Sequence, residues 1–149
     1  MSALTVIDDV LNGRASVLPV PADGSHQTSM LTTTLRAGEQ IDDDVAVVLS
    51  TSGTTGTPKG ALLTARALVA SAEATHRRLG GQGRWLLALP AHHVAGFQVL
   101  VRSVVAGSDP VAVPASVDAD ELVAAVTALG SGRRYASLVA AQLDKALRD

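Results

Sequence analysis

The sequence contains no cysteine, and it has a single tryptophan, a single tyrosine and a single phenylalanine. Without cysteine the chain forms no disulfide and offers no thiolate nucleophile or cysteine-ligated metal, which agrees with a reducing compartment. Because aromatic residues make up only 2% of the chain, the core must consist of Ala, Val and Leu. Small aliphatic side chains bury less area per residue than rings do, so we expect a domain of marginal stability on its own.

The sequence also lacks long apolar runs and an excess of either charge. Hydrophobic residues make up 47% of the chain, but Gly, Pro and charged residues interrupt them, and no run approaches the ~20 residues of a membrane span. A formal net charge of -2 favours neither a nucleic-acid partner nor an anionic membrane. An export signal begins with basic residues followed by an apolar run, whereas this sequence has Asp8 and Asp9 near its start, so we predict no export signal. These features together indicate a cytoplasmic protein.

The chain of 149 residues has the length of one domain, and we expect a single α/β domain over residues 1–149. Apolar residues at helical spacing from Ala3 to Leu11, followed by a short apolar run from Ala15 to Val20, predict a leader helix and strand within residues 1–21. Residues 22–44 lack periodicity and are interpreted as a loop or linker. Residues 45–149 then form the main α/β region.

Strand and helix patterns alternate through residues 45–149. The uninterrupted apolar block Val45 to Leu49 is typical of a strand buried on both faces of a parallel sheet. Further strands are predicted at Trp85 to Leu89, Val111 to Val113 and Tyr135 to Val139, with helices after Thr64, from Val94, after Asp118 and from Ala140. Asp118 and Glu121 have the spacing of a capping box. This alternation predicts an α/β fold with a mostly parallel sheet and flanking helices.

After the first buried strand, the chain has the composition of a phosphate-binding loop. The run reads Ser52-Gly53-Thr54-Thr55-Gly56-Thr57-Pro58-Lys59-Gly60. Glycines let the backbone approach an anion, hydroxyl groups donate hydrogen bonds, and Lys59 adds a mobile positive charge. The spacing fits neither a Walker loop nor the dinucleotide fingerprint. A surface turn is the plain alternative, but a lysine that ends a hydroxyl-rich loop directly after an apolar strand favours polyphosphate.

A second group of candidate residues, Pro90-Ala91-His92-His93-Val94-Ala95-Gly96, follows the strand that ends at Leu89. In a parallel sheet this position lies at the same edge as the phosphate loop. Taken alone, His93 is better explained as a residue that starts a helix, but its position beside the phosphate loop favours a role in the site. Adjacent histidines rarely share one metal ion, and the acidic run Asp42 to Asp44 reads as a solvated approach to the next strand. We therefore predict no metal site built from these side chains.

The run from Thr51 to Gly60 resembles the signature loop of the adenylate-forming superfamily, which includes acyl-CoA synthetases, peptide-synthetase adenylation domains and luciferases. In overall likeness the chain is most similar to the o-succinylbenzoate-CoA ligases of menaquinone biosynthesis. The resemblance implies that ATP phosphates are bound by Thr51, Ser52, Gly53, Thr54, Thr55, Gly56, Thr57 and Lys59. His93 and Gly96 match the family's Pro-x-x-His pattern and its following glycine, which implies that they bind the carboxylate substrate. Lys59 and His93 would be catalytic.

The resemblance implies a ligase that uses ATP, Mg²⁺ and coenzyme A, with a small-molecule carboxylate as its other substrate. It covers only the phosphate loop and the first wall of the acyl pocket, and the family's later segments have no match here. We therefore expect the N-terminal portion of a ligase, inactive alone, whose exposed apolar surface favours self-association. A nucleotide-binding module without turnover and a ligase for another fatty or aryl acid remain alternatives, and the acyl group is left open.

Overall fold

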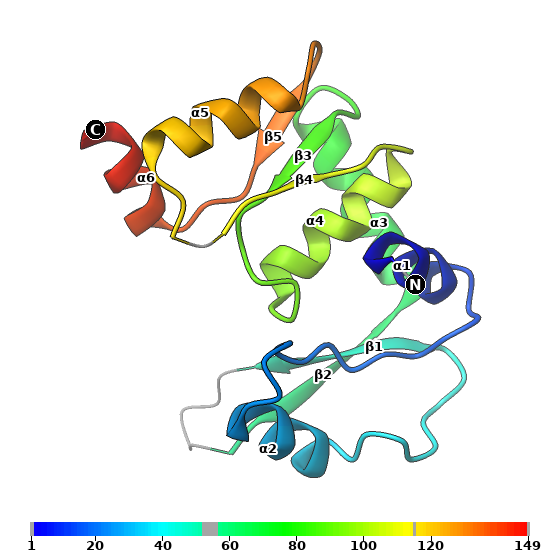
Figure 1. Ribbon diagram of the computed structural model, residues 1–149. Coiled ribbons are helices and arrows are strands. Elements are labelled where there is room, and N and C mark those ends of the chain that lie inside the picture. The colour runs from blue at the N-terminus through cyan, green and yellow to red at the C-terminus, as the bar shows by residue number, and fades with distance from the viewer. Residues whose placement is uncertain (1, 52–56, 115, 149) are drawn as a thin grey trace.

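The computed structural model describes residues 2–51, 57–114 and 116–148, which form two small β-sheets joined and covered by helices (Figure 1). The N-terminal helix lies at one side of the molecule, at mid-height in Figure 1, and contacts α3, α4 and β1. The elements, in chain order, are α1 (Ala3–Leu11), α2 (His26–Thr34), β1 (Val45–Thr51), β2 (Lys59–Thr64), α3 (Ala65–Arg78), β3 (Arg84–Leu87), α4 (Val94–Val105), β4 (Val111–Ala112), α5 (Ala119–Ala128), β5 (Arg134–Ala136) and α6 (Ala140–Arg148).

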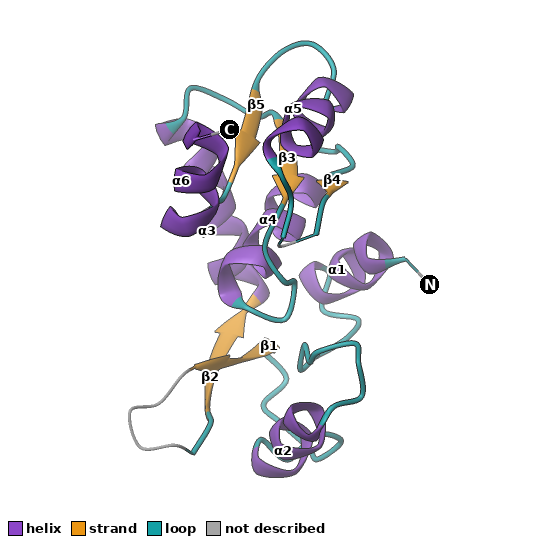
Figure 2. Cartoon of the chain, turned by 60° about the vertical axis from the view of Figure 1, so that its left-hand side comes forward, coloured by secondary structure: helices purple, strands orange, loops and turns teal. Residues whose placement is uncertain are grey.

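The larger sheet has three parallel strands in the order β4-β3-β5. Successive side chains of β3 point to opposite faces of this sheet. Trp85 lies against His76 of α3 and Arg102 of α4, whereas Leu86 packs with Ala125 of α5 and other apolar residues on the other face. Helices therefore cover both faces (Figure 2), which confirms the α/β prediction for this part of the chain.

The smaller sheet corrects the predicted pairing of the first buried strand. The strand expected at Val45 to Leu49 is confirmed as β1, but it pairs with β2 in antiparallel fashion, with Thr51 opposite Lys59. The two strands form a separate sheet. The physical reason is length, because residues 52–58 are too few for the crossover of roughly a dozen residues that parallel neighbours need. β1 and β2 therefore make a hairpin.

The main hydrophobic core lies between this hairpin and the helices α1, α3 and α4. The predicted leader helix is confirmed as α1, which directs Ile7 and Val10 into the core. The predicted start of α3 is also confirmed, since the Thr64 hydroxyl accepts a hydrogen bond from the Ala67 N–H at 3.1 Å. The buried residues of this core are Ile7, Val10, Ala46, Val47, Leu49, Leu68, Ala72, Phe97, Leu100 and Val101. Aliphatic side chains dominate this core, as the composition predicted.

The structure contradicts two predictions for the N-terminal part. The run Ala15 to Val20 is not a strand, and within it Val17 alone pairs, through an isolated bridge to Val47. Pro19 lacks the N–H that a continuing ladder would need. The segment 22–44, predicted as a loop or linker, contains α2, whose one buried residue is Leu31. A helix with one anchoring apolar residue among threonines has no periodicity for sequence reasoning to detect.

Among the described residues, no helix is both long and apolar enough to cross a lipid bilayer.

A cluster of rings with one guanidinium group lies between the parallel sheet and helices α3 and α4. Trp85 donates a hydrogen bond from Nε1 to Nε2 of His76 at 3.4 Å, and the Arg102 guanidinium carbon lies 4.8 Å from the centroid of the Trp85 ring. Tyr135 packs against the same tryptophan, with ring centroids 5.0 Å apart. His76 is 4% exposed. Its burial, and secondly the charge of Arg102, lower the pKa of His76.

We expect the stability of the protein to fall as the pH drops below about 6.5, the ordinary pKa of histidine. His76 stays neutral in the folded state because its pKa is lowered there, whereas the unfolded chain takes up a proton near the ordinary value. Stability is therefore lost from about pH 6.5 down to the folded pKa, by at most about 1.4 kcal/mol per pH unit for one proton. We would measure the free energy of unfolding in urea at several pH values in this range. It should change less steeply with pH in His76→Gln, a variant that keeps an acceptor for Trp85. Equal slopes in the two proteins would contradict this explanation.

Candidate functional site

A cavity of about 550 Å³ lies between α2, the β1–β2 hairpin and the start of α4. This volume is within the range of about 300–1,000 Å³ that is usual for small-molecule sites. Apolar side chains form most of the wall, with hydroxyl groups, one amide and one imidazole among them. The lining residues are Gln27, Met30, Leu31, Leu49, Ser50, Thr51, Thr57, Pro58, Ala61, Leu63, His93 and Val94.

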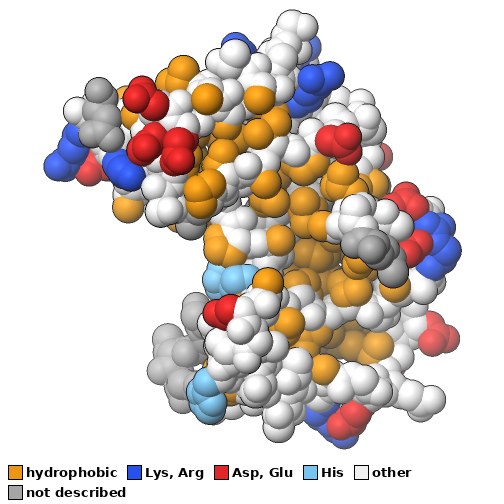
Figure 3. Space-filling model, viewed as in Figure 1, with side chains coloured by type: hydrophobic (Ala, Val, Ile, Leu, Met, Phe, Trp, Pro, Cys, Tyr) orange, Lys and Arg blue, Asp and Glu red, His pale blue; other side chains and the backbone are white. Residues whose placement is uncertain are grey.

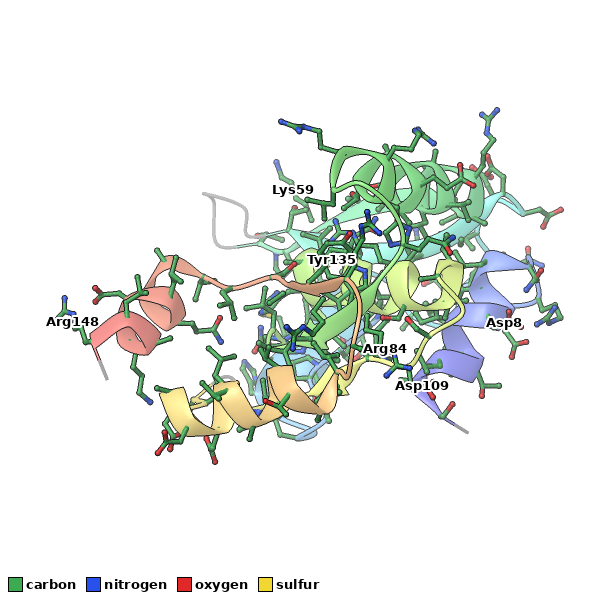
Figure 4. The ribbon with its side chains drawn as sticks, turned by 90° about the horizontal axis from the view of Figure 1, so that it is seen from above. Asp8, Lys59, Arg84, Asp109, Tyr135 and Arg148 are labelled. Carbon is green, nitrogen blue, oxygen red and sulfur yellow. The ribbon has the colours of Figure 1, made fainter. Side chains whose placement is uncertain are left out.

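The loop end of the hairpin places the two ends of the predicted phosphate loop side by side. Thr51 and Lys59 are cross-strand partners, and the Thr51 hydroxyl donates a hydrogen bond to the Lys59 carbonyl oxygen at 3.2 Å. Lys59 projects from the hairpin (Figure 4) and is exposed. Within the described parts of the chain, its ammonium group has no ion-pair partner. It is therefore available to an anion bound at this end of the hairpin.

The structure places only some of the predicted phosphate-binding residues. Thr51 and Thr57 both line the cavity, and Lys59, which follows Thr57 closely in the sequence, is the first residue of β2. Gly60 packs closely, since a Cβ at this position would lie 2.7 Å from Cγ1 of Val48. Ser52, Gly53, Thr54, Thr55 and Gly56 lie outside the described residues.

His93 lines the same cavity from the other side. It is the N-cap residue of α4, with extended backbone at φ -99° and ψ 150°, and its side chain makes no capping hydrogen bond. Its N–H donates to the Pro90 carbonyl oxygen at 3.1 Å, which closes the turn before the helix. The imidazole is exposed. The structure thus brings His93 together with Thr51 and Thr57, although the hairpin and β3 belong to different sheets rather than to one shared edge.

His92 is the immediate neighbour of His93, with ring centroids 4.3 Å apart. The pKa of His92 is lowered, mainly by burial and to a smaller extent by the nearby His93. The carboxylate of Asp23 acts to raise this pKa. Figure 3 shows histidine side chains at the surface beside the notch between the part that holds α2 and the part that holds α5 and α6. Among the described residues, no group of three His, Cys, Asp or Glu side chains has the arrangement of a metal site.

Gly96 lies in the first turn of α4 and does not line the cavity. A Cβ here would lie 2.3 Å from the Pro90 carbonyl oxygen and 2.6 Å from the Leu89 carbonyl oxygen. The absent side chain lets the turn that carries His93 fold back onto the helix. The predicted contact between Gly96 and substrate stays a prediction, and the packing gives this glycine a role in positioning His93.

Helix α2 supplies the part of the cavity wall that sequence reasoning missed. Gln27, Met30 and Leu31 stand at i, i+3 and i+4, so they share one helix face, and all three line the cavity. The one sequence signal for this helix was Ser25, which immediately precedes it, because serine is favoured at the N-cap position. The threonine-rich sequence that follows concealed it.

Comparison with known proteins agrees with the motif. Residues 6–132 match the AMP-binding enzyme family. A probable 2-succinylbenzoate–CoA ligase from Mycobacterium tuberculosis is 60% identical over 148 residues, which cover 98% of this chain and 38% of that protein. The o-succinylbenzoate coenzyme A synthetase from Bacillus subtilis, solved in complex with AMP, has 29% identity and a TM-score of 0.61 over 82% of this chain and 33% of its own. The same synthetase with ATP and magnesium ion gives 30% identity and a TM-score of 0.59, over 70% and 22% of the two chains.

The chain therefore spans 38% of the length of the Mycobacterium tuberculosis relative. The matched region, residues 6–132, includes the hairpin, the turn with His93 and the parallel sheet except for its strand β5. Together with the loop sequence and the α/β architecture, this match shows that the chain belongs to the AMP-binding enzyme family.

Proposed function

We propose that this chain is the N-terminal portion of an AMP-forming acid–CoA ligase that acts on o-succinylbenzoate in menaquinone biosynthesis. The observation that carries the proposal is that Thr51 and Thr57, on either side of the glycine-rich loop, share one cavity with His93. The 60% identity to a probable 2-succinylbenzoate–CoA ligase supports the choice of acid. The chain would contribute the phosphate grip and one wall of the acid pocket to the whole enzyme.

In the first step a carboxylate oxygen of the acid attacks the α-phosphorus of ATP. A bond forms between that oxygen and phosphorus, the bond from the α-phosphorus to the bridging oxygen breaks, and pyrophosphate leaves with the electron pair. Negative charge grows on pyrophosphate, so donors fixed around the β- and γ-phosphates lower the barrier. In this proposal Thr51, Thr57 and Lys59 are donors of this kind.

The residues at the hairpin end fit a polyphosphate with its magnesium ion. Hydroxyl groups and the exposed ammonium group of Lys59 are donors for phosphate oxygens, and the phosphates themselves supply the oxygen ligands that Mg²⁺ prefers. When bound, Mg²⁺ would neutralise part of the charge on the leaving pyrophosphate. Lys59 holds the phosphates on the protein side, and His93 orients the carboxylate at the opposite side of the cavity.

In the second step the sulfur of coenzyme A attacks the carbonyl carbon of the acyl-adenylate. A thioester bond forms, the bond to the AMP oxygen breaks, and the thiol proton is released. The described residues of this chain offer no further group for this step, which we assign to the remainder of the enzyme.

The proposal is tested with the protein purified from its own chromosomal gene. We expect an intact mass well above the 15.2 kDa of this chain, and exchange of pyrophosphate into ATP that depends on o-succinylbenzoate and not on a fatty acid. Exchange with a fatty acid instead would reassign the substrate. ATP binding without exchange for any acid would indicate a nucleotide-binding module and would sink the ligase proposal.

A further inference from the structure

We infer that helix α2 selects the acid, through Gln27 and Met30, and that the acid is one with an apolar body and a second oxygen-bearing group. The inference rests on the proposed function and adds residues that line the cavity from outside both motifs. It follows from three features of α2: its anchoring, the face that it turns to the cavity, and the exposed amide of Gln27.

The helix is held in place independently of any ligand. Leu31 is 3% exposed and anchors the helix face that lines the cavity. At the N-terminal end the Thr28 hydroxyl donates to the Pro21 carbonyl oxygen at 2.9 Å, and the Ser25 N–H donates to a carboxylate oxygen of Asp23 at 3.1 Å. The side chains that α2 presents to the cavity are therefore positioned by the fold.

The face that α2 turns to the cavity combines two kinds of contact. Met30 is half-buried and offers a polarizable, adaptable surface that suits a ring or an alkyl chain. Gln27 is exposed, and its amide has no hydrogen-bond partner in the described parts of the chain. A side-chain amide carries both donors and an acceptor, so Gln27 can bind an oxygen-bearing group of a ligand that rests on Met30.

The opposite wall fixes the direction in which the acid lies. Leu49 and Leu63 of the hairpin are apolar, whereas Thr51 and His93 supply the polar groups. The reacting carboxylate would lie beside His93, facing the phosphates that Thr51 binds in the proposed function. The apolar body would then lie between the hairpin leucines and Met30, and the second polar group would reach Gln27.

The test uses acid-dependent pyrophosphate exchange by the natural full-length protein, with o-succinylbenzoate as the acid. Gln27→Ala should raise the KM for the acid about three- to tenfold, as expected for one lost hydrogen bond, and should leave the KM for ATP unchanged. Gln27→Glu should raise it further, because a carboxylate repels an anionic acid. Met30→Ala should also raise the KM for the acid. Ser29→Ala is the matched control, since Ser29 is exposed and does not line the cavity.

The outcomes separate this inference from the proposed function. If the parent protein exchanges pyrophosphate with o-succinylbenzoate but Gln27→Ala, Gln27→Glu and Met30→Ala all keep the parental KM for the acid, the role of α2 is overturned and the ligase stands. If the parent shows no acid-dependent exchange, both are overturned. If the Gln27 variants raised the KM for ATP by the same factor as the KM for the acid, this result would also contradict a role confined to the acid.

Discussion

Replacement of Gly96 by alanine is expected to lower the free energy of unfolding by about 3 kcal/mol, at the upper end of the usual cost of overpacking. The new Cβ would lie 2.3 Å from the Pro90 carbonyl oxygen and 2.6 Å from that of Leu89. Both are backbone atoms, so no side-chain rotation relieves the contact, and the turn that carries His93 must move. For a chain of this size the midpoint of thermal unfolding should fall by about 10 °C.

Gly107→Ala is the matched control for this prediction. Gly107 also adjoins α4, at its other end, but a Cβ there would meet no atom of the described residues within 4 Å. Its φ of +62° leaves only the strain of the left-handed conformation, worth about 1 kcal/mol. If the two alanine variants lost equal stability, the close approach at Gly96 would not explain its cost.

Replacement of Lys59 by alanine in the full-length protein is expected to slow acyl-adenylate formation at least about 100-fold, the usual effect of removing one donor that stabilises developing charge. Lys59 is exposed at the end of the hairpin, so the fold should remain intact. Pyrophosphate exchange measures the rate, and the midpoint of urea unfolding checks the fold.

Arg66→Ala serves as the control for Lys59→Ala. It removes the same charge from another exposed side chain, in the first turn of α3, close in sequence to the hairpin. Its exchange rate should stay within about twofold of the parent, because a screened surface charge contributes little at a distance. Parental exchange by Lys59→Ala would remove this lysine from the mechanism.

Local signals in the sequence predicted most helices correctly. In α5 the Glu121 N–H donates to Asp118 Oδ1 at 2.8 Å, and the Asp118 N–H donates to Glu121 Oε2 at 3.1 Å, so the predicted capping box is confirmed. Such a cap involves residues three apart and needs no knowledge of the rest of the fold. α1, α3, α4 and α6 were predicted for similar reasons, from periodicity and flanking residues.

Strand pairing and the α2 wall depend on contacts that a local pattern does not contain. An apolar block such as Val45 to Leu49 is compatible with either pairing direction, and only its connection to Lys59 decides between them. For the site, composition and motif predicted Thr51, Thr57, Lys59 and His93. Gln27 and Met30 have no motif, and their place in the cavity follows from the packing of Leu31.

The ring cluster around Trp85 has a spectroscopic consequence. Trp85 is the only tryptophan of the chain and is 3% exposed, so its fluorescence emission should be blue-shifted in the folded protein and move to longer wavelength on unfolding. The indole lies beside Tyr135 and under Arg102, on the sheet that does not line the cavity. Its emission therefore reports the integrity of the parallel sheet, and occupation of the cavity has to be followed with another probe.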